Sequence, residues 1–316
     1  MVERLIIIGA GPAGLTAALY AARAGLEPLV LTGYTVGGQI LLSPCVENFP
    51  GFPEGVVGSD LSDLWQQQAV RFGARCVLAE VMSVDFKSRP FKVSTSKEVY
   101  EAEAVIIATG ASAKRLGLES ERRLTGKGVS TCATCDGVFF RGKDVVVVGG
   151  GDTAMDEALF LSRIVKSVTV VHRRDKLRAS KVLQRRACSN EKISFIWNHV
   201  VEDIVGENQV EGVLLRNVKT GEKRQVECQG VFVAVGYQPN TALFKNEIRL
   251  DQWGYIKLRK WSETTVKGVF AAGDVHDSRY RQAITAAGTG CKAAMDAIKY
   301  LEEHGAASNR MRDVKA

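Results

Sequence analysis

The sequence lacks the features that would mark a membrane or exported protein. No apolar run approaches the ~20 residues that a helix needs to cross a bilayer. The chain opens at Arg4 directly into a strand pattern, with no basic segment and apolar segment of a signal peptide ahead of it. We therefore expect a cytoplasmic protein that does not act on a membrane.

Residues that bind metals are also few and poorly spaced. A structural zinc ion needs four ligands, but only one Cys-x-x-Cys pair is present, Cys132 and Cys135, and the four histidines show no ligand spacing. This favours a redox pair over a metal site, and we expect no bound metal. The remaining cysteines are isolated and are expected to be buried free thiols: Cys45, Cys76, Cys188, Cys228 and Cys291.

Positive charge is in moderate excess, but it is not organised for nucleic acid. The chain has 42 basic and 35 acidic residues, a net charge of +7. Its three arginine pairs, at 122–123, 173–174 and 185–186, lack interleaved aromatic residues and match no nucleic-acid motif. We expect no nucleic-acid partner, and a solvated surface is the default interpretation for two of the three pairs.

The segment Thr131-Cys132-Ala133-Thr134-Cys135-Asp136 is the most distinctive in the chain. Two cysteines at this spacing can close a small disulfide on the first turn of a helix, where backbone amides and the helix dipole stabilise a thiolate. In a reducing cytosol such a disulfide is more often catalytic than structural. The pair is therefore predicted to be a reversible two-electron store.

Residues 4–32 have the pattern of a βαβ unit that binds a dinucleotide. A buried strand, Leu5–Ile8, leads into Gly9, Gly11 and Gly14 and then into an alanine-rich helix. These glycines permit a tight turn, close approach of backbone amides to a pyrophosphate, and close packing of helix on sheet. No acidic residue stands at the end of the second strand, so the contact to the adenosine ribose is unassigned.

The same order returns about 140 residues later. Val145–Val148 lead into Gly149, Gly150 and Gly151 and then into a helix and a second strand. The closing strand also recurs, because Val231–Gly236 echoes Val105–Gly110. This internal duplication predicts two dinucleotide sites in one chain.

The second unit ends its second strand with a basic cluster of His172, Arg173, Arg174 and Arg178. Guanidinium groups suit the 2′-phosphate of NADP, whereas an acidic residue there would favour NAD. A solvated basic patch is the alternative. The position of the cluster favours NADPH.

Two further segments carry turn residues. The loops around Gly38, Gln39 and Asn48 are either surface turns or part of a site. An apolar strand ends in Gly273 and Asp274, where the carboxylate either contacts ribityl hydroxyls of a flavin or caps a turn. Arg281 and Gln282 then precede a helix from about Ala283, whose N-terminal amides could stabilise negative charge on a reduced flavin.

These motifs, in this order from Arg4 to about Leu301, resemble those of bacterial-type, low-molecular-mass thioredoxin reductases. The resemblance implies an α/β fold of two Rossmann-like, three-layer ββα domains, with the NADPH domain inserted into a discontinuous FAD domain. The implied boundaries are 1–113 and 246–316 for FAD and 114–245 for NADPH. The family is homodimeric, and a short two-stranded hinge joins its domains.

The resemblance also implies site residues and a mechanism. FAD contacts are expected at Gly9, Gly11, Pro12, Ala13, Gly14, Gly38, Gln39, Asn48, Thr109, Gly110, Gly273, Asp274, Arg281, Gln282 and Ala283. NADPH contacts are expected at Gly149, Gly151, Asp152, Thr153, Ala154, His172, Arg173, Arg174, Arg178 and Gly236. The implied activity is that of a thioredoxin-disulfide reductase: electrons pass from NADPH to FAD, to the Cys132–Cys135 disulfide and then to thioredoxin.

Three points remain open at the level of sequence. Asp136 is the candidate acid and base for the thiols, or else a carboxylate in the first turn of a helix. The partner could be another dithiol protein, of the glutaredoxin or peroxiredoxin systems, and Cys135 is only weakly favoured over Cys132 as the attacking thiol. Because one arrangement cannot place the disulfide against both flavin and partner, we expect the NADPH domain to rotate between half-reactions.

Overall fold

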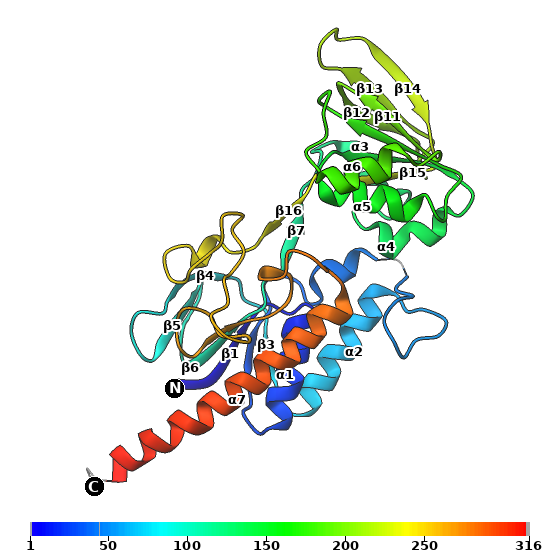
Figure 1. Cartoon of the computed structure of the whole chain (residues 1–316). Coiled ribbons are helices and arrows are strands. Elements are labelled where there is room, and N and C mark those ends of the chain that lie inside the picture. The colour runs from blue at the N-terminus through cyan, green and yellow to red at the C-terminus, as the bar shows by residue number, and fades with distance from the viewer. Residues whose placement is uncertain (1, 44, 314–316) are drawn as a thin grey trace. The chain divides into compact units, whose positions relative to one another are not determined.

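The computed structural model describes residues 2–43 and 45–313. The chain forms two compact units, one of Met1–Ser112 with Gln238–Ala316 and the other of Ala113–Tyr237. Both chain crossings run through short strands, β7 (Ala111–Ala113) and β16 (Tyr237–Pro239), which pair as a two-stranded sheet (Figure 1).

The second crossing differs from the boundary expected from sequence, because residues 238–245 belong to the discontinuous unit. Asn240 exchanges hydrogen bonds of 2.8 Å with Thr109 in both directions. Phe244 is fully buried and stacks on Phe86, with ring centroids 6.3 Å apart. These contacts keep the segment after β16 in the first unit.

The first unit is built on a seven-stranded sheet in the order β3-β2-β1-β6-β5-β4, with β17 also pairing with β6. Its strands are β1 (Val2–Ile8), β2 (Leu29–Leu31), β3 (Arg75–Val77), β4 (Val81–Asp85), β5 (Phe91–Thr95), β6 (Val99–Ile107) and β17 (Val269–Ala271). β1 is parallel to both neighbours, so Ile7 lies between Val30 and Ile106. Only the β4-β5-β6 meander is antiparallel.

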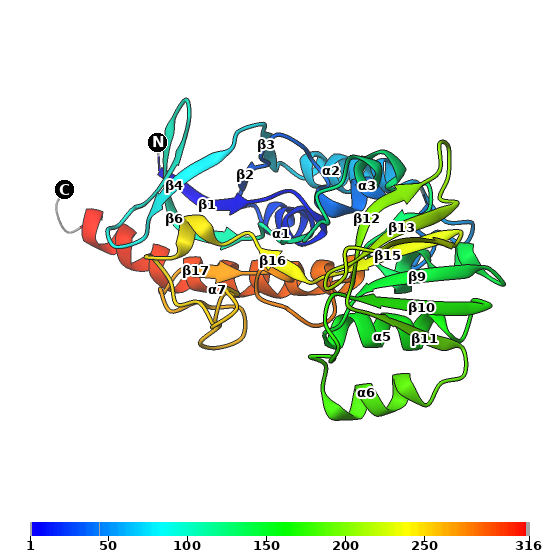
Figure 2. The same ribbon diagram turned by 90° about the horizontal axis from the view of Figure 1, so that it is seen from above.

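Alternation along β1 divides the core of this unit into two layers. Leu5 and Ile7 pack with the helices, whereas Ile6 and Ile8 pack with the meander and the segments that cover it. The helices are α1 (Pro12–Arg23), α2 (Gly58–Arg71) and α7 (Ala283–Asp313) (Figures 1 and 2). This unit also contains three short 3₁₀ helices, η1 (Gly38–Leu42), η3 (Ala242–Phe244) and η4 (Gly273–Val275).

The second unit has a five-stranded parallel sheet in the order β11-β10-β9-β15-β8. Its strands are β8 (Val129–Ser130), β9 (Asp144–Gly149), β10 (Ser167–His172), β11 (Ile193–Trp197) and β15 (Gly230–Ala234). Helices α5 (Asp152–Leu161) and α6 (Lys181–Cys188) pack in one core layer. The opposite layer is an antiparallel sheet of β12 (His199–Val205), β13 (Gly212–Asn217) and β14 (Lys223–Glu227).

Three short elements complete the second unit: α3 (Glu119–Leu124), α4 (Ala133–Asp136) and η2 (Gly137–Phe140). The repeat seen in the sequence is therefore a repeat of fold, since β1-α1-β2 with β6 corresponds to β9-α5-β10 with β15. This confirms the prediction of two Rossmann-like units with three layers each. No helix in residues 2–43 and 45–313 is long and apolar enough to span a bilayer.

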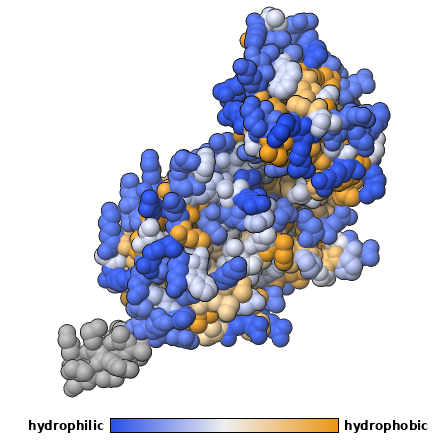
Figure 3. All heavy atoms as spheres, in the orientation of Figure 1, coloured by the Kyte–Doolittle hydropathy of each residue, from blue (hydrophilic) through white to orange (hydrophobic). Residues whose placement is uncertain are grey.

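Hydrophilic side chains cover most of the visible face of each unit, and apolar side chains form small patches among them (Figure 3).

The five isolated cysteines are free thiols as predicted, but the prediction that they are buried is wrong for most of them. Only Cys228 is buried, and Cys188 is exposed because it ends α6 on the solvent side. Cys45, Cys76 and Cys291 lie in between.

Candidate active site

The redox pair is a closed disulfide in the second unit. Cys132 and Cys135 are bonded, with their Cα atoms 5.3 Å apart. The edge strand β8 ends at Ser130, and Cys132 is the N-cap of the four-residue helix α4. Both sulfurs thus belong to one turn that leaves the carboxyl end of a parallel sheet, which confirms the predicted disulfide.

Asp136 is the last residue of α4, and its side chain is largely buried. Ser130 Oγ lies 2.5 Å from Asp136 Oδ2 and donates to it. The other carboxylate oxygen, Oδ1, is buried and has no hydrogen-bond partner within the described part of the chain. Burial raises the pKa of Asp136, and the hydrogen bond from Ser130 opposes that rise. A carboxyl whose pKa is raised by burial beside a disulfide is a candidate to exchange protons with the thiols.

The first glycine turn is shaped by close backbone packing. Gly9 has φ +108°, which favours glycine, and a Cβ at Gly14 would lie 1.9 Å from the Gly9 carbonyl oxygen. Gly11 is the N-cap of α1 and makes no side-chain cap. The first-turn amides of α1 are therefore not satisfied by a cap, an arrangement suited to a phosphate.

Segments that are distant in the sequence meet at two places in the first unit. Gly273, the first residue of η4, lies so close to α1 that a Cβ added to it would be 2.9 Å from that of Ala13. Its amide donates to Thr289 Oγ1 at 2.8 Å. Asn48 Nδ2 donates to Gln282 Oε1 at 3.2 Å, which joins two of the predicted flavin residues.

Asp274 follows Gly273 in η4. Burial is the largest influence on this carboxyl, and together with nearby Asp277 it raises the pKa to about 6, against the effect of Arg281. An enclosed carboxylate of this kind needs hydroxyl donors or a proton. This is the donor–acceptor match that ribityl hydroxyls would supply.

The second glycine turn repeats the first in the other unit. A Cβ at Gly149 would lie 2.4 Å from the Ala234 carbonyl oxygen, whereas Gly151 has open space around it. Gly151 is the N-cap of α5 and also makes no side-chain cap. Asp152 has a role that the sequence did not suggest, since its Oδ1 accepts the amide of Ser180 at 2.7 Å and fixes the start of α6.

The basic cluster is divided between buried and exposed positions. Arg173 and Arg174 are exposed directly after β10. His172 is only 4% exposed, and its Nε2 is 3.1 Å from the Lys176 carbonyl oxygen. Burial and the neighbouring arginines lower the pKa of His172, so this imidazole is neutral at pH 7. A Cβ at Gly150 would overlap its ring, at 2.3 Å from Cε1, so the histidine packs on the glycine turn.

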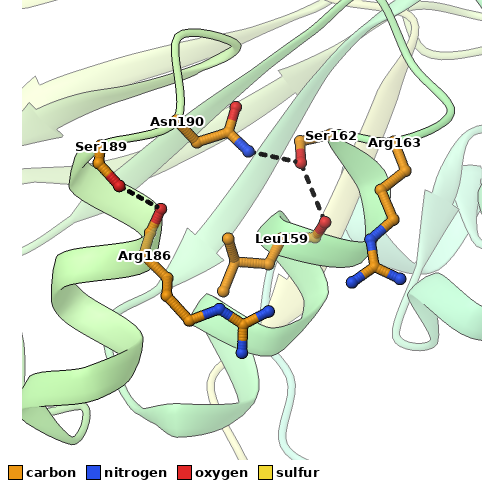
Figure 4. A pocket seen from close by; sticks show the side chains of 6 residues that line it. All are labelled: Leu159, Ser162, Arg163, Arg186, Ser189 and Asn190. Atoms are coloured by element: carbon orange, nitrogen blue, oxygen red, sulfur yellow. Dashed lines mark hydrogen bonds between the residues drawn. The ribbon is translucent and has the colours of Figure 1, made fainter.

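A cavity of about 320 Å³ in the second unit is not part of either turn (Figure 4). It is lined by Leu159, Ser162, Arg163, Arg186, Ser189 and Asn190. It lies at the carboxyl ends of α5 and α6, where the basic side chains of Arg163 and Arg186 offset the helix dipoles. Ser162 and Asn190 satisfy one another, with Asn190 Nδ2 donating at 3.0 Å (Figure 4).

Sequence reasoning missed three polar contacts near the predicted site. Ser130 precedes the cysteine motif and has no motif of its own. Tyr237 donates its hydroxyl to the Thr131 carbonyl at 2.6 Å, although 106 residues separate them. Thr289 looked like an ordinary helix residue. Within the described ranges, no group of three or more histidines, cysteines or carboxylates could hold a metal ion.

Comparison with known proteins agrees with this geometry. The pyridine nucleotide-disulphide oxidoreductase family model matches residues 3–290. A thioredoxin reductase of Streptomyces clavuligerus is 56% identical over 303 residues, covering 95% of this chain and 94% of the relative. One of Mycolicibacterium smegmatis is 50% identical over 303 residues, covering 96% and 97%.

Solved structures give the same result. A thioredoxin reductase from Giardia duodenalis superposes with a TM-score of 0.90 at 42% identity, covering 95% of this chain and 98% of that one. One from Streptococcus pyogenes matches equally well. From the disulfide, the two glycine turns and these likenesses together, the chain belongs to the pyridine nucleotide-disulphide oxidoreductase family and, within it, to the thioredoxin reductases.

Proposed function

We propose that this protein is an NADPH-dependent thioredoxin-disulfide reductase that carries FAD. Membership of the family implies the use of a flavin and a nicotinamide nucleotide. The observation that carries the proposal is the Cys132–Cys135 disulfide, set in one of two duplicated dinucleotide-type units. A bound flavin would take two electrons from the nicotinamide and deliver them to this disulfide.

FAD is assigned to the first unit. The uncapped start of α1 at Gly11 suits the pyrophosphate, and the enclosed Asp274 carboxylate suits ribityl hydroxyls. Asn48 and Gln282, already joined by a hydrogen bond, would contact the cofactor together. The remaining proposed contacts are Gly9, Pro12, Ala13, Gly14, Gly38, Gln39, Thr109, Gly110, Gly273, Arg281 and Ala283.

NADPH is assigned to the second unit. The uncapped start of α5 at Gly151 suits the nucleotide pyrophosphate. The exposed guanidinium groups of Arg173 and Arg174 suit a 2′-phosphate, which a bare ribose of NADH lacks. Buried His172 would support the turn through Gly150. The remaining proposed contacts are Gly149, Asp152, Thr153, Ala154, Arg178 and Gly236.

The chemistry at the cysteines follows from thiol–disulfide exchange. Two electrons break the Cys132–Cys135 bond and leave one thiolate and, after one protonation, one thiol. The thiolate attacks a sulfur of the thioredoxin disulfide and expels the other as a thiolate. The second cysteine then resolves the mixed disulfide, while Asp136 accepts its proton and supplies a proton to the leaving sulfur. The products are reduced thioredoxin and the original disulfide.

The proposal extends to assembly and movement. A homodimer in the cytoplasm is expected from the resemblance to the family. Rotation of the NADPH unit would let the disulfide serve the flavin and thioredoxin in turn. Only β7 and β16 carry the chain between the units, so such a rotation requires few backbone torsions to change.

The decisive experiment is Cys135→Ser, with Cys188→Ser as the matched control at an exposed free thiol. NADPH should still bleach the flavin of Cys135→Ser, but reduction of thioredoxin, followed by NADPH absorbance, should be abolished. Cys188→Ser should retain both steps. Loss of flavin reduction together with thioredoxin reduction in Cys135→Ser would show that the disulfide does not lie downstream of the flavin.

A further inference from the structure

We propose that Ser130 is a positioning residue for the thiol–disulfide chemistry, because its hydroxyl joins the Asp136 carboxyl to the backbone of Cys132 and governs how Asp136 exchanges protons with the cysteine pair. The inference rests on the proposed function. Ser130 lies outside the cysteine motif, and its hydroxyl contacts the backbone of Cys132.

Three contacts converge on the Ser130 hydroxyl. It accepts the amide N–H of Cys132 at 3.0 Å. It donates to Asp136 Oδ2 at 2.5 Å and lies 3.4 Å from the Cys132 carbonyl oxygen. A serine hydroxyl has one proton to donate and two lone pairs to accept with. The Ser130 hydroxyl therefore donates its hydrogen bond to the Asp136 carboxylate, and one of its lone pairs accepts the hydrogen bond from the Cys132 amide.

This arrangement can follow the protonation of Asp136. With the carboxylate ionised, Ser130 donates to it, which is the stronger charge-assisted bond. With the carboxyl protonated, Asp136 becomes the donor and the serine proton can turn to the Cys132 carbonyl. Ser130 thus has a partner in both protonation states, and its 7% exposure keeps water from replacing it.

The surroundings of Ser130 contain few charged groups that could affect proton exchange at Asp136. It lies in β8, whose register with β15 places it beside Phe232. The β15 strand carries no ionisable side chain. From α5, Asp156 and Glu157 line a cavity with Ala133 and Thr134 of the redox turn, and Arg141 follows η2.

Burial raises the pKa of Asp136, and Ser130 is the group that opposes it. Loss of the hydroxyl would remove the hydrogen bond that stabilises the ionised form. The protonated fraction of Asp136 at neutral pH would then increase.

The test compares Ser130→Ala with Ser130→Thr, which keeps the hydroxyl, each in the wild-type and Asp136→Asn backgrounds of the flavin-loaded enzyme. A hydrogen bond to a charged group is worth about one to two pKa units. The acid limb of the pH profile for thioredoxin reduction should therefore move up by about one to two pH units in Ser130→Ala. The acid limb should not move in Ser130→Thr. In the Asp136→Asn background, Ser130→Ala should cause no further shift of the acid limb.

A second readout does not depend on turnover. The midpoint potential of the Cys132–Cys135 pair, set in dithiothreitol buffers and read by alkylation and mass spectrometry, should show a break against pH that moves upward in Ser130→Ala. An unmoved limb and break, or an equal effect in the Asp136→Asn background, would overturn the role of Ser130. If Ser130→Ala fails to retain flavin, Ser130→Gly removes the same hydroxyl. Failure of the wild type to reduce thioredoxin would instead refute the proposed function, and the potential measurement would still test Ser130.

Discussion

Replacement of Asp274 by asparagine should remove a pH dependence from the stability of the flavin-free protein. Burial and Asp277 raise the pKa of Asp274 from its ordinary value of 3.8 to about 6. The folded chain therefore binds this proton more tightly than the unfolded chain. This contribution to stability is therefore fully present below pH 3.8 and is lost as the pH rises through about 6.

The magnitude follows from linkage. One pKa unit corresponds to about 1.4 kcal/mol, so the whole contribution is about 3 kcal/mol. Between pH 5 and pH 7.5, where unfolding is convenient to measure, linkage leaves roughly half of it, about 1.4 kcal/mol. Such a difference is about three times the effect of an ordinary surface substitution, about 0.5 kcal/mol.

Urea denaturation at a series of pH values gives the measurement. The free energy of unfolding of the flavin-free wild type should fall by about 1.4 kcal/mol more between pH 5 and 7.5 than that of Asp274→Asn. Asp63→Asn, at an exposed carboxylate in α2 of the same unit, is the control and should behave like the wild type. Hydroxyl donors from FAD would stabilise the ionised form, so FAD affinity should rise with pH in the wild type alone. Equal slopes for wild type and Asp274→Asn would refute the reasoning.

Three further predictions concern the rest of the chain. Arg173→Ala should raise the Michaelis constant for NADPH about 10-fold to 100-fold, because it removes a charge-assisted phosphate contact. That for NADH should stay unchanged, as should both constants in the exposed α6 variant Arg185→Ala; equal rises for both nucleotides would remove the phosphate assignment. In α7, Gly290→Ala would put a Cβ 2.1 Å from the Ala13 carbonyl oxygen, whereas Gly288→Ala meets nothing within 4 Å. Thermal unfolding should show Gly290→Ala destabilised by about 1–3 kcal/mol and Gly288→Ala neutral or stabilised by up to about 1 kcal/mol, and equal effects would argue against close α1–α7 packing. Tyr237→Phe removes the donor to the Thr131 carbonyl and should lower the free energy of unfolding by about 1 kcal/mol in urea; an unchanged value would mean that this bond contributes nothing to folding.

Local patterns in the sequence were sufficient for the repeated units. Apolar runs that end in glycines, such as Leu5–Ile8 before Gly9, predict a buried parallel strand and a tight turn because those properties depend on neighbouring residues. The same pattern recurs at Gly149, and it predicted a second unit of the same kind. The Cys132–Cys135 spacing likewise predicted the disulfide, since residues three apart in a turn are within bonding reach.

Burial and the second domain boundary were less accessible to such patterns. Cysteine composition suggested buried thiols, but whether Cys188 faces solvent depends on which side of α6 packs on the sheet. The boundary near residue 245 was displaced to Tyr237 because Asn240 and Phe244 are held by contacts with Thr109 and Phe86. These partners are more than a hundred residues away in the chain.

The sequence alone therefore determined the two glycine turns, the order of strands and helices around them, and the identity of the redox cysteines. Only the tertiary structure decided that Ser130 donates to Asp136, that Gly273 lies against Ala13, and that Asn48 meets Gln282. The physical reason is that turns and periodicity arise from sterics between near neighbours, whereas hydrogen bonds and burial of single side chains depend on where the folded chain brings distant segments together.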